Sequence, residues 1–141
     1  MKSILSFLIF ISFISITASC NSQVQDKDKQ QQGTEADKVE VYYFHFTRRC
    51  ATCNAVENET QVALKNFYPD KLDSGDIIFI SINLEEEENE VVAKKLEVSG
   101  QALIVVRGDQ KFDLTNDGFK YARSNPEKLH ESIQATIDKL I

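Results

Sequence analysis

The chain has 141 residues, a formal net charge of −6, 42% hydrophobic residues and three cysteines. This length suits one domain rather than two. The acidic balance argues against a nucleic-acid partner held by a basic surface. With 5 glycines and 2 prolines, the composition also excludes a collagen-like or largely disordered chain.

The first twenty residues differ in kind from the rest. Lys2 gives a positive start, residues 4–16 are apolar apart from serines, and small residues lead into Cys20. This is the pattern of a secretory signal, and the apolar run is shorter than the roughly 18–20 residues that a membrane-spanning helix needs. We therefore expect residues 1–19 to be a signal peptide.

The segment before Cys20 resembles the signal of bacterial lipoproteins, in which the cysteine at the cleavage point is lipidated. Thr17 stands where that pattern prefers Leu, and an ordinary secretory signal with an incidental cysteine is the alternative. The resemblance implies a protein of the cell envelope, outside the cytoplasm, anchored to the membrane through Cys20. Removal of residues 1–19 takes the net charge from −6 to −7, because Lys2 is the one charged residue lost.

Residues 20–38 are polar and low in complexity, with three consecutive glutamines and alternating Asp and Lys. This stretch has almost nothing to bury, so we interpret it as a flexible tether between the lipid and a domain. The remaining residues, 39–141, number about a hundred, enough for one domain that folds alone.

The first elements of this domain are a strand and a helix. Residues 39–46 are β-branched and aromatic without clean alternation, which predicts a strand covered on both faces. From Cys50 the apolar period becomes helical. The expected inner face comprises Val56, Thr60, Ala63, Leu64 and Phe67. Pro69 and the Asp73-Ser74-Gly75 run are expected to break this helix.

Residues 76–84 carry a run of isoleucines and predict a second buried strand. Residues 85–98 are helical by composition, and Gly100 is the expected exit. The inward residues would be Val91, Val92 and Leu96. The run Glu85–Glu88 suits the first turn of a helix, which favours negative charge; a calcium site is less favoured because consecutive carboxylates diverge around a helix.

Residues 102–106 predict a third strand, and Gly108-Asp109 a hairpin turn into a shorter fourth strand at residues 111–114. Asn116-Asp117-Gly118 marks another turn. Asn125-Pro126 then provides the cap and first position of a last helix. Its buried stripe would comprise Leu129, Ile133, Thr136, Ile137 and Leu140.

The predicted order is therefore β-α-β-α-β-β-α, an α/β domain. The first crossover makes the first two strands parallel, and the hairpin makes the last two antiparallel. We expect a mixed four-stranded sheet with helices on both faces.

The chemical motif is Cys50-Ala51-Thr52-Cys53, directly after the first strand and at the start of the first helix. This spacing brings the two sulfurs within disulfide range, while the amides and dipole of the helix terminus stabilise a thiolate. Cys50 would be the nucleophile and Cys53 would resolve the mixed disulfide. Arg48 and Arg49 would lower the pKa of Cys50, unless they are ordinary loop charges. One close pair in an exported chain indicates a redox or metal site rather than a disulfide framework.

Strand, C-x-x-C and helix in this order resemble the thioredoxin fold in its minimal form, across residues 39–141. Residues 43–53, 98–103 and 121–123 also resemble small thioredoxin-like lipoproteins of Bacteroidetes-type bacteria, labelled as a nitrophenyl compound nitroreductase subunit (ArsF-type) family. The resemblance implies a thiol–disulfide oxidoreductase whose partner is a protein dithiol or disulfide. The nitroreductase label does not follow from the residues: no G-x-G-x-x-G is present, so no flavin or nicotinamide cofactor is expected.

Three positions depart from the thioredoxin pattern. Arg49 stands where thioredoxins carry Trp, Phe44 where they carry a buried acid, and Ala102 where they carry a cis-proline that faces the cysteines. Because a non-proline cis bond costs about 2.5–4 kcal/mol, we expect trans geometry around Ala102. The absence of the acid at Phe44 and of the proline at Ala102 suggests a narrow substrate range or a slow reaction.

The loss of proline at Ala102 leaves a second hypothesis, in which Cys50 and Cys53 bind a thiophilic metal such as Cu(I), or trivalent arsenic. His45 is the candidate third ligand, and a histidine packed in a buried strand is the alternative. A closed zinc site, which needs four ligands, is not expected.

Three residues near the C-terminus have weaker assignments. His130 flanks the last helical stripe and is expected at the surface. Tyr121 and Arg123 either line the rim of the site or cover the edge of the sheet. The sequence leaves the direction of electron flow and the oligomeric state open.

Overall fold

The computed structural model describes residues 37–141, and the structural statements below concern this part of the chain. The expected signal peptide, the lipidated Cys20 and all but the last residues of the tether lie outside it. The elements in order are β1 (Val39–His45), α1 (Ala51–Phe67), α2 (Pro69–Ser74), β2 (Ile77–Asn83), the 3-10 helix η2 (Glu87–Asn89), α3 (Glu90–Lys95), β3 (Ala102–Arg107), β4 (Gln110–Asp113), α4 (Thr115–Tyr121) and α5 (Pro126–Ile137).

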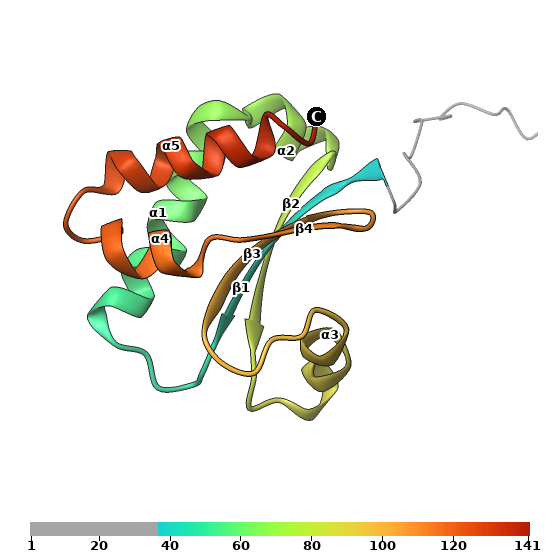
Figure 1. The fold of residues 1–141 in the computed structure, drawn as a ribbon, viewed down its shortest axis with the longest axis vertical. Helices are drawn as coiled ribbons and strands as arrows, with labels where there is room; N and C mark the ends of the chain where they lie inside the picture. The colour runs from blue at the N-terminus through green and yellow to red at the C-terminus, as the bar shows by residue number, and fades with distance from the viewer. Residues whose placement is uncertain (1–36) are drawn as a thin grey trace, which may run out of the picture. The chain divides into compact units, whose positions relative to one another are not determined.

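The four strands form one mixed sheet in the order β2-β1-β3-β4 (Figure 1). β1 and β2 are parallel, from Val39 opposite Ile77 to His45 opposite Asn83. β3 runs antiparallel to both β1 and β4. The predicted mixed four-stranded α/β sheet, with its parallel first pair and its hairpin, is therefore confirmed.

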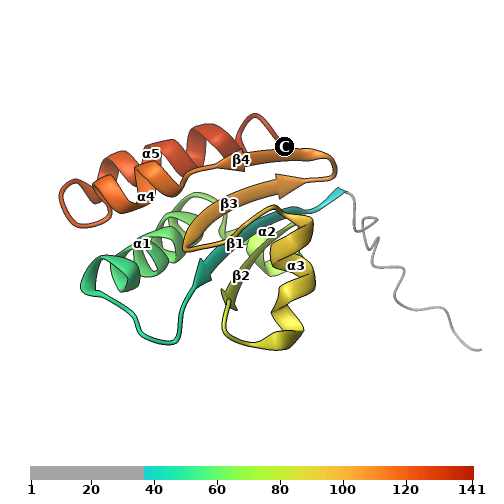
Figure 2. The ribbon, with the colours of Figure 1, turned by 60° about the horizontal axis from the view of Figure 1, so that its bottom comes forward.

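Helices cover both faces of this sheet, as Figure 2 shows: α1, α4 and α5 lie on one side and α3 on the other. Alternate residues of β1 feed the two cores, so that Tyr43 packs with α1 and α5 while Phe44 packs with α3. Tyr43 and Phe44 are both fully buried. The prediction that the first strand is covered on both faces is confirmed.

α1 and α5 form where the helical stripes predict them. Both bury their stripes against the sheet, except that Phe67, the last residue of α1, is 39% exposed. At the start of α5 the Asn125 side chain accepts a hydrogen bond from the Lys128 amide, and Pro126 occupies the first position. No helix within residues 37–141 is long and apolar enough to cross a membrane.

The expected break after α1 is a second short helix. Tyr68 ends α1, and Pro69 starts α2 at once, because a proline lacks only an amide that the first helical turn does not use. Gly75, with φ of 76°, ends α2 in the left-handed conformation. The turn signals therefore mark the ends of α2 and not a loop.

β2 is less buried than predicted. It lies at the edge of the sheet, and only Ile77 and Ile82 of its seven residues are buried, while Ser81 is exposed. A run of isoleucines does not distinguish an edge strand from a central one, since that depends on the order of strands.

In place of one helix over residues 85–98, the chain forms the 3-10 helix η2 followed by α3. The Glu85 carboxylate accepts a hydrogen bond from the Thr47 amide, which keeps this residue in the loop. Hydrogen bonding by the Thr47 side chain and then by its amide lowers the pKa of the Glu85 carboxyl. Val91 is 73% exposed, so its predicted inward position is wrong. The chain leaves α3 through Glu97, whose φ is 54°, rather than through Gly100.

The turn expected at residues 116–118 lies inside α4. The Asp113 carboxylate accepts a hydrogen bond from the Thr115 amide at 2.8 Å and helps to start this helix. Gly118 is buried in α4. Any larger residue would be crowded there, because a Cβ would lie 3.1 Å from a methyl carbon of Val56. The glycine therefore permits close approach of α4 to α1.

Candidate functional site: the Cys50–Cys53 disulfide

Cys50 and Cys53 form a disulfide at the N-terminus of α1, with their Cα atoms 5.0 Å apart. Cys50 is the N-cap of the helix, with extended backbone dihedrals, and Cys53 lies one turn further on. Cys50 is exposed, whereas Cys53 is only 3% exposed. A thiol reagent or a partner protein therefore reaches the first sulfur and not the second.

The two cysteines cap the helix reciprocally through sulfur. The Cys53 amide donates to Cys50 Sγ at 3.0 Å, and the Cys50 amide donates to Cys53 Sγ at 3.1 Å. This is the arrangement of a capping box, with sulfur atoms in place of the usual oxygens. Negative charge that develops on Cys50 lies at the positive end of the helix dipole, next to an amide that already faces it.

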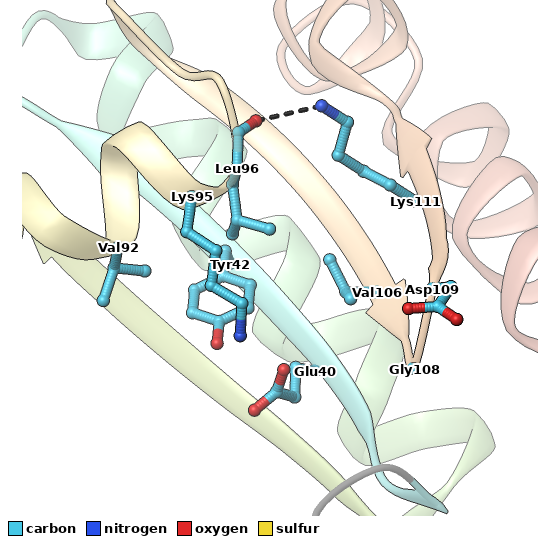
Figure 3. Close-up of a pocket in the computed structure, with 9 residues that line it drawn as sticks. All are labelled: Glu40, Tyr42, Val92, Lys95, Leu96, Val106, Gly108, Asp109 and Lys111. Carbon is cyan, nitrogen blue, oxygen red and sulfur yellow. Dashed lines mark hydrogen bonds between the residues drawn. The ribbon is translucent and has the colours of Figure 1, made fainter.

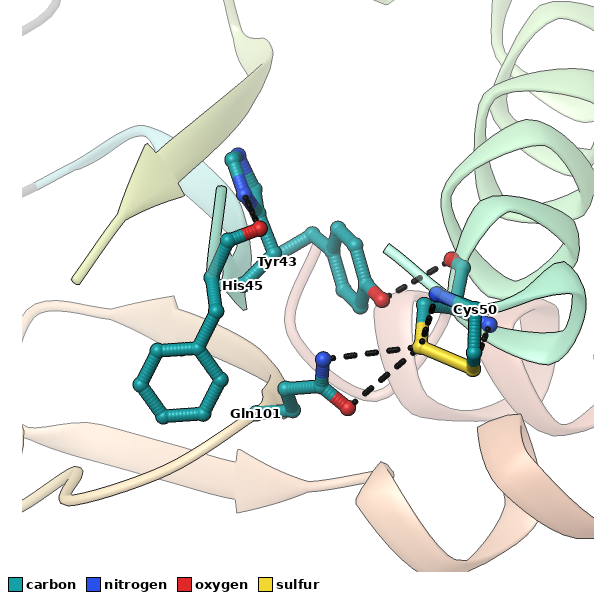
Figure 4. Close-up of a disulfide and its surroundings, with 6 residues drawn as sticks. Tyr43, His45, Cys50 and Gln101 are labelled. Atoms are coloured by element: carbon teal, nitrogen blue, oxygen red, sulfur yellow. Dashed lines mark hydrogen bonds between the residues drawn. A yellow bond between two sulfur atoms is a disulfide. The ribbon is translucent and has the colours of Figure 1, made fainter. Parts of the chain in front are cut away.

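Tyr43 lies beneath the disulfide, and its hydroxyl donates to the Cys53 carbonyl oxygen at 2.8 Å (Figure 4). Burial raises the pKa of Tyr43, and the nearby Arg49 guanidinium opposes part of that rise. The phenol therefore remains a neutral donor at physiological pH and ties β1 to the first turn of α1. Tyr43 is not among the site residues that the sequence predicts.

Gln101 touches the buried sulfur directly. Its Nε2 and Oε1 atoms lie 3.4 and 3.5 Å from Cys53 Sγ, and Figure 4 shows the amide aimed at the disulfide. Gln101 directly precedes β3, so the chain places it opposite the start of α1. Its position next to Ala102, which the sequence does single out, is the one signal that points to it.

Ala102 itself is 7% exposed, lies opposite Phe44 in the sheet and packs in the α3-side core. All peptide bonds of the described residues are trans, as expected around Ala102. Phe44 belongs to the same core, on the face of β1 opposite to Tyr43. The side chain that meets Cys53 is therefore that of Gln101, the neighbour of Ala102.

The two arginines before the motif behave differently. Arg48 is exposed, whereas the Arg49 guanidinium forms an ion pair with Glu57 and lies 3.4 Å from Ser81 Oγ. The same guanidinium lies 6.0 Å from the centre of the Tyr43 ring. Glu57 balances part of the positive charge that Arg49 brings to the motif. The sequence does not predict this partner, although Glu57 lies four residues after Cys53 on the same helix.

His45 lies apart from the two cysteines. It is 8% exposed, its Nδ1 lies 3.0 Å from the Phe46 carbonyl oxygen, and its ring lies 6.0 Å from that of Tyr43. In Figure 4 the Tyr43 side chain lies between His45 and the disulfide. Within residues 37–141 no three His, Cys, Asp or Glu side chains are grouped to hold a metal ion. His45 is thus a histidine packed in a buried strand, which is the alternative to a third metal ligand.

The three C-terminal candidates lie on α4, α5 and the loop between them. His130 is partly buried rather than fully at the surface, and it pairs with Glu59 at 3.0 Å, which joins α5 to α1. Tyr121 packs against the core, and the Lys120 and Lys128 ammonium groups lie 5.0 and 4.9 Å from the centre of its ring. Their interaction with the phenol lowers the pKa of Tyr121. Arg123 is exposed.

A groove of about 650 Å³ opens on the α3 face of the sheet. Figure 3 shows its lining by apolar side chains of the sheet and α3, with charged residues at the margin. The charged residues are Glu40, Lys95, Asp109 and Lys111. Lys111 binds the Leu96 carbonyl oxygen at 3.0 Å and so fastens β4 to the end of α3. The lining includes neither cysteine of the motif nor Gln101.

No protein-family description and no curated protein matches this chain. Among solved structures, one described as "Structure of a malarial protein" is similar to part of it, with a TM-score of 0.39 and 21% identical residues. The similarity covers 52% of this chain and 74% of that one. A likeness this low carries no argument about fold family or function.

Proposed function

We propose that this protein is a thioredoxin-like thiol–disulfide oxidoreductase that acts outside the cytoplasm on a protein dithiol or disulfide. The observation that carries the proposal is the disulfide at the start of α1, with an exposed Cys50 and a buried Cys53. Because of this difference in access, a substrate would contact the Cys50 sulfur, whereas the Cys53 sulfur would react only with Cys50. The pair has the C-x-x-C spacing and the disulfide bond that a redox role requires.

The thioredoxin-like assignment is supported by the order of elements, and the proposed kinship with the small lipoproteins rests on residues 43–53, 98–103 and 121–123. A strand leads into the cysteine pair at a helix start, a parallel strand follows, and an antiparallel hairpin and a last helix complete the order. Helices α2 and α4 are additions to the minimal β-α-β-α-β-β-α pattern.

The reducing reaction would proceed in two exchanges. The Cys50 thiolate attacks a substrate disulfide, so a Cys50–substrate S–S bond forms while the substrate's own S–S bond breaks, its electron pair leaving on the other substrate sulfur. Cys53 then loses its proton and attacks Cys50 Sγ, forming the Cys50–Cys53 disulfide and releasing the second substrate thiolate. Two electrons pass to the substrate, whose thiolates take up two protons. A dithiol of a partner protein regenerates the reduced pair, and the reversed sequence oxidises dithiols.

The membrane anchor in this proposal rests on the lipoprotein-like pattern before Cys20. Replacement of this residue, Cys20→Ser, removes the thiol that would carry the lipid. We expect the variant, expressed in a bacterium that processes lipoproteins, to move from the membrane fraction to the soluble envelope fraction. Metabolic labelling with a fatty acid provides the direct measurement, and equal labelling of both chains would contradict the anchor.

Binding of a thiophilic metal by Cys50 and Cys53 is the competing proposal. With His45 apart, it depends on the two sulfurs alone. It predicts stoichiometric uptake of Cu(I) or trivalent arsenic by the reduced protein and little disulfide exchange.

The test of the proposed function uses the full chain and glutathione disulfide as the model substrate. The reduced protein should consume glutathione disulfide and form its own disulfide, as counted from alkylated thiols by mass. Cys50→Ser should abolish this reaction. An equal rate for the variant and the wild-type protein would overturn the assignment.

A further inference from the structure

We propose that Gln101 is a catalytic residue of this pair. Its side-chain amide accepts a hydrogen bond from the Cys53 thiol in the reduced protein and donates one to the Cys53 thiolate as it attacks. The inference rests on the proposed function, because it concerns the second exchange of that reaction. Gln101 would thereby control how readily the Cys50–Cys53 disulfide bond forms and breaks.

The geometry that carries the inference is a contact of both amide atoms with one sulfur. Gln101 Nε2 lies 3.4 Å and Oε1 3.5 Å from Cys53 Sγ, within the range of hydrogen bonds to sulfur (Figure 4). A primary amide carries two donors and an acceptor, so a small rotation of its plane exchanges one function for the other. The same side chain can therefore serve a thiol, which donates, and a thiolate, which accepts.

The second argument is that Cys53 has few other partners. It is 3% exposed, so water does not solvate a charge that forms there. The Tyr43 hydroxyl is directed to the Cys53 carbonyl oxygen and not to its sulfur. Apart from the Cys50 amide at 3.1 Å, the amide of Gln101 is the polar group that the described structure brings to this atom.

In the reduced protein the Cys53 S–H donates to Gln101 Oε1, which no disulfide sulfur can do. The amide therefore binds the reduced pair better than the oxidised pair. During the second exchange, the Cys53 proton goes to solvent and Nε2 donates to the thiolate. The Cys53–Cys50 bond then forms, the Cys50–substrate bond breaks, and the electron pair leaves on the substrate sulfur.

Two measurements on the full chain test the inference, with Gln101→Met as the variant because methionine keeps the length of the side chain and lacks the amide. The first is the equilibrium between the Cys50–Cys53 pair and glutathione. A hydrogen bond with a net contribution of about 1 kcal/mol changes this equilibrium constant roughly fivefold. We therefore expect the variant to favour the disulfide about 3–10-fold more than the wild-type protein does. The second is the lifetime of the mixed disulfide with glutathione, trapped by acid, which should lengthen by a similar factor.

Gln110→Met, on the exposed surface of β4, is the matched control and should change neither quantity. Gln101→Glu keeps the shape but offers only acceptors when ionised. It should lengthen the mixed-disulfide lifetime more than Gln101→Met does, and less so as the pH falls and the carboxyl is protonated. A purely structural role for Gln101 would lower the melting temperature without this pH dependence.

The outcomes separate the two proposals. A wild-type protein that equilibrates with glutathione, together with a Gln101→Met protein that behaves like Gln110→Met, would overturn the role of Gln101 and leave the proposed function intact. A wild-type protein with no reversible equilibrium would overturn both. If Gln101→Met does not fold, Gln101→Glu decides by the same two measurements.

Discussion

Cys50 and Cys53 are separated by two residues and yet have different surroundings. Cys50 faces solvent at the helix N-terminus, where a thiolate gains from the Cys53 amide and the helix dipole. Cys53 is covered by Tyr43 and Gln101. In the proposed reaction the pair thus divides the chemistry between an accessible nucleophile, Cys50, and a protected resolving sulfur, Cys53.

This division predicts opposite results for the two serine variants. Cys53→Ser should still attack glutathione disulfide and then stop at the mixed disulfide, because no second thiol is present to release it. Cys50→Ser should form no mixed disulfide, since the buried Cys53 cannot reach the substrate. Intact mass after acid quenching measures both, and a stable glutathione adduct on Cys50→Ser would contradict the assignment of roles.

The sequence predicts the cysteines but not their supporting residues. The C-x-x-C spacing at a strand–helix junction is local, so it can be read from the chain alone. Gln101 meets Cys53 across 48 positions, and Arg49 meets Ser81 across 32, so both contacts depend on the fold. The folded structure also pairs Arg49 with Glu57, so this arginine does not bring an uncompensated positive charge to the cysteines.

At the scale of elements, the long amphipathic helices and the central strands are predictable and the short helices are not. α1 and α5 repeat their apolar stripes over several turns, and a pattern of that length rarely arises by chance. α2, α3 and α4 have six or seven residues each, and their signals (Pro69, Gly100 and Gly118) are also turn signals. Tertiary contacts decide whether such a segment forms a short helix or a turn.

Gly118 illustrates such a contact and gives a prediction. A Cβ at this position would lie 3.1 Å from Val56, whereas one at Gly100 would have no neighbour within 4 Å. Gly118→Val should therefore push α4 from α1 and cost about 1–3 kcal/mol of unfolding free energy in urea. Gly100→Ala is the control and should be close to neutral; equal effects of the two changes would show that α4 does not need the close approach.

Tyr68 joins the end of α1 to α5 and gives a pH-dependent prediction. Its hydroxyl donates to Asp138 Oδ1 at 2.5 Å and lies 3.2 Å from the Gln134 carbonyl oxygen. Burial, and then the Asp138 carboxylate, raise the pKa of Tyr68 well above its usual range. A raised folded-state pKa contributes stability that is complete below the ordinary value of about 10 and is lost as the pH rises beyond it.

Tyr68→Phe should thus be less stable than the wild-type protein by about 1 kcal/mol at pH 7. The difference should shrink above a pH of about 10, because only the wild-type unfolded chain gains stability by ionising this phenol. Urea unfolding of the oxidised wild-type and Tyr68→Phe proteins at pH 7 and above a pH of about 10 measures this difference in stability. A difference that grows with pH would contradict the direction of the shift.

At the scale of the whole molecule, two cores hold the sheet from opposite sides. The larger core joins α1, α4 and α5 to the sheet and contains Leu129, Ile133 and Ile137, all fully buried. The smaller core lies under α3. The start of α1, where the disulfide lies, is therefore positioned by the larger core.

Ile133→Ala should cost about 2–5 kcal/mol of unfolding free energy, because it opens a cavity in that core. Val91→Ala, at a position that is 73% exposed, is the matched control and should change stability little. Urea unfolding of both variants provides the measurement, and similar losses would contradict the assignment of the larger core as the main support of the fold.

The central claim is that Cys50 and Cys53 cycle between a dithiol and a disulfide. The most direct test is the reduction potential of this pair in the full chain, equilibrated in glutathione or dithiothreitol buffers with and without copper and read from trapped thiols by mass. A reversible two-electron couple between roughly −120 and −270 mV, unchanged when copper is withheld, is the predicted result. A pair that does not equilibrate, or that oxidises only when the metal is absent, would contradict the claim and favour metal binding.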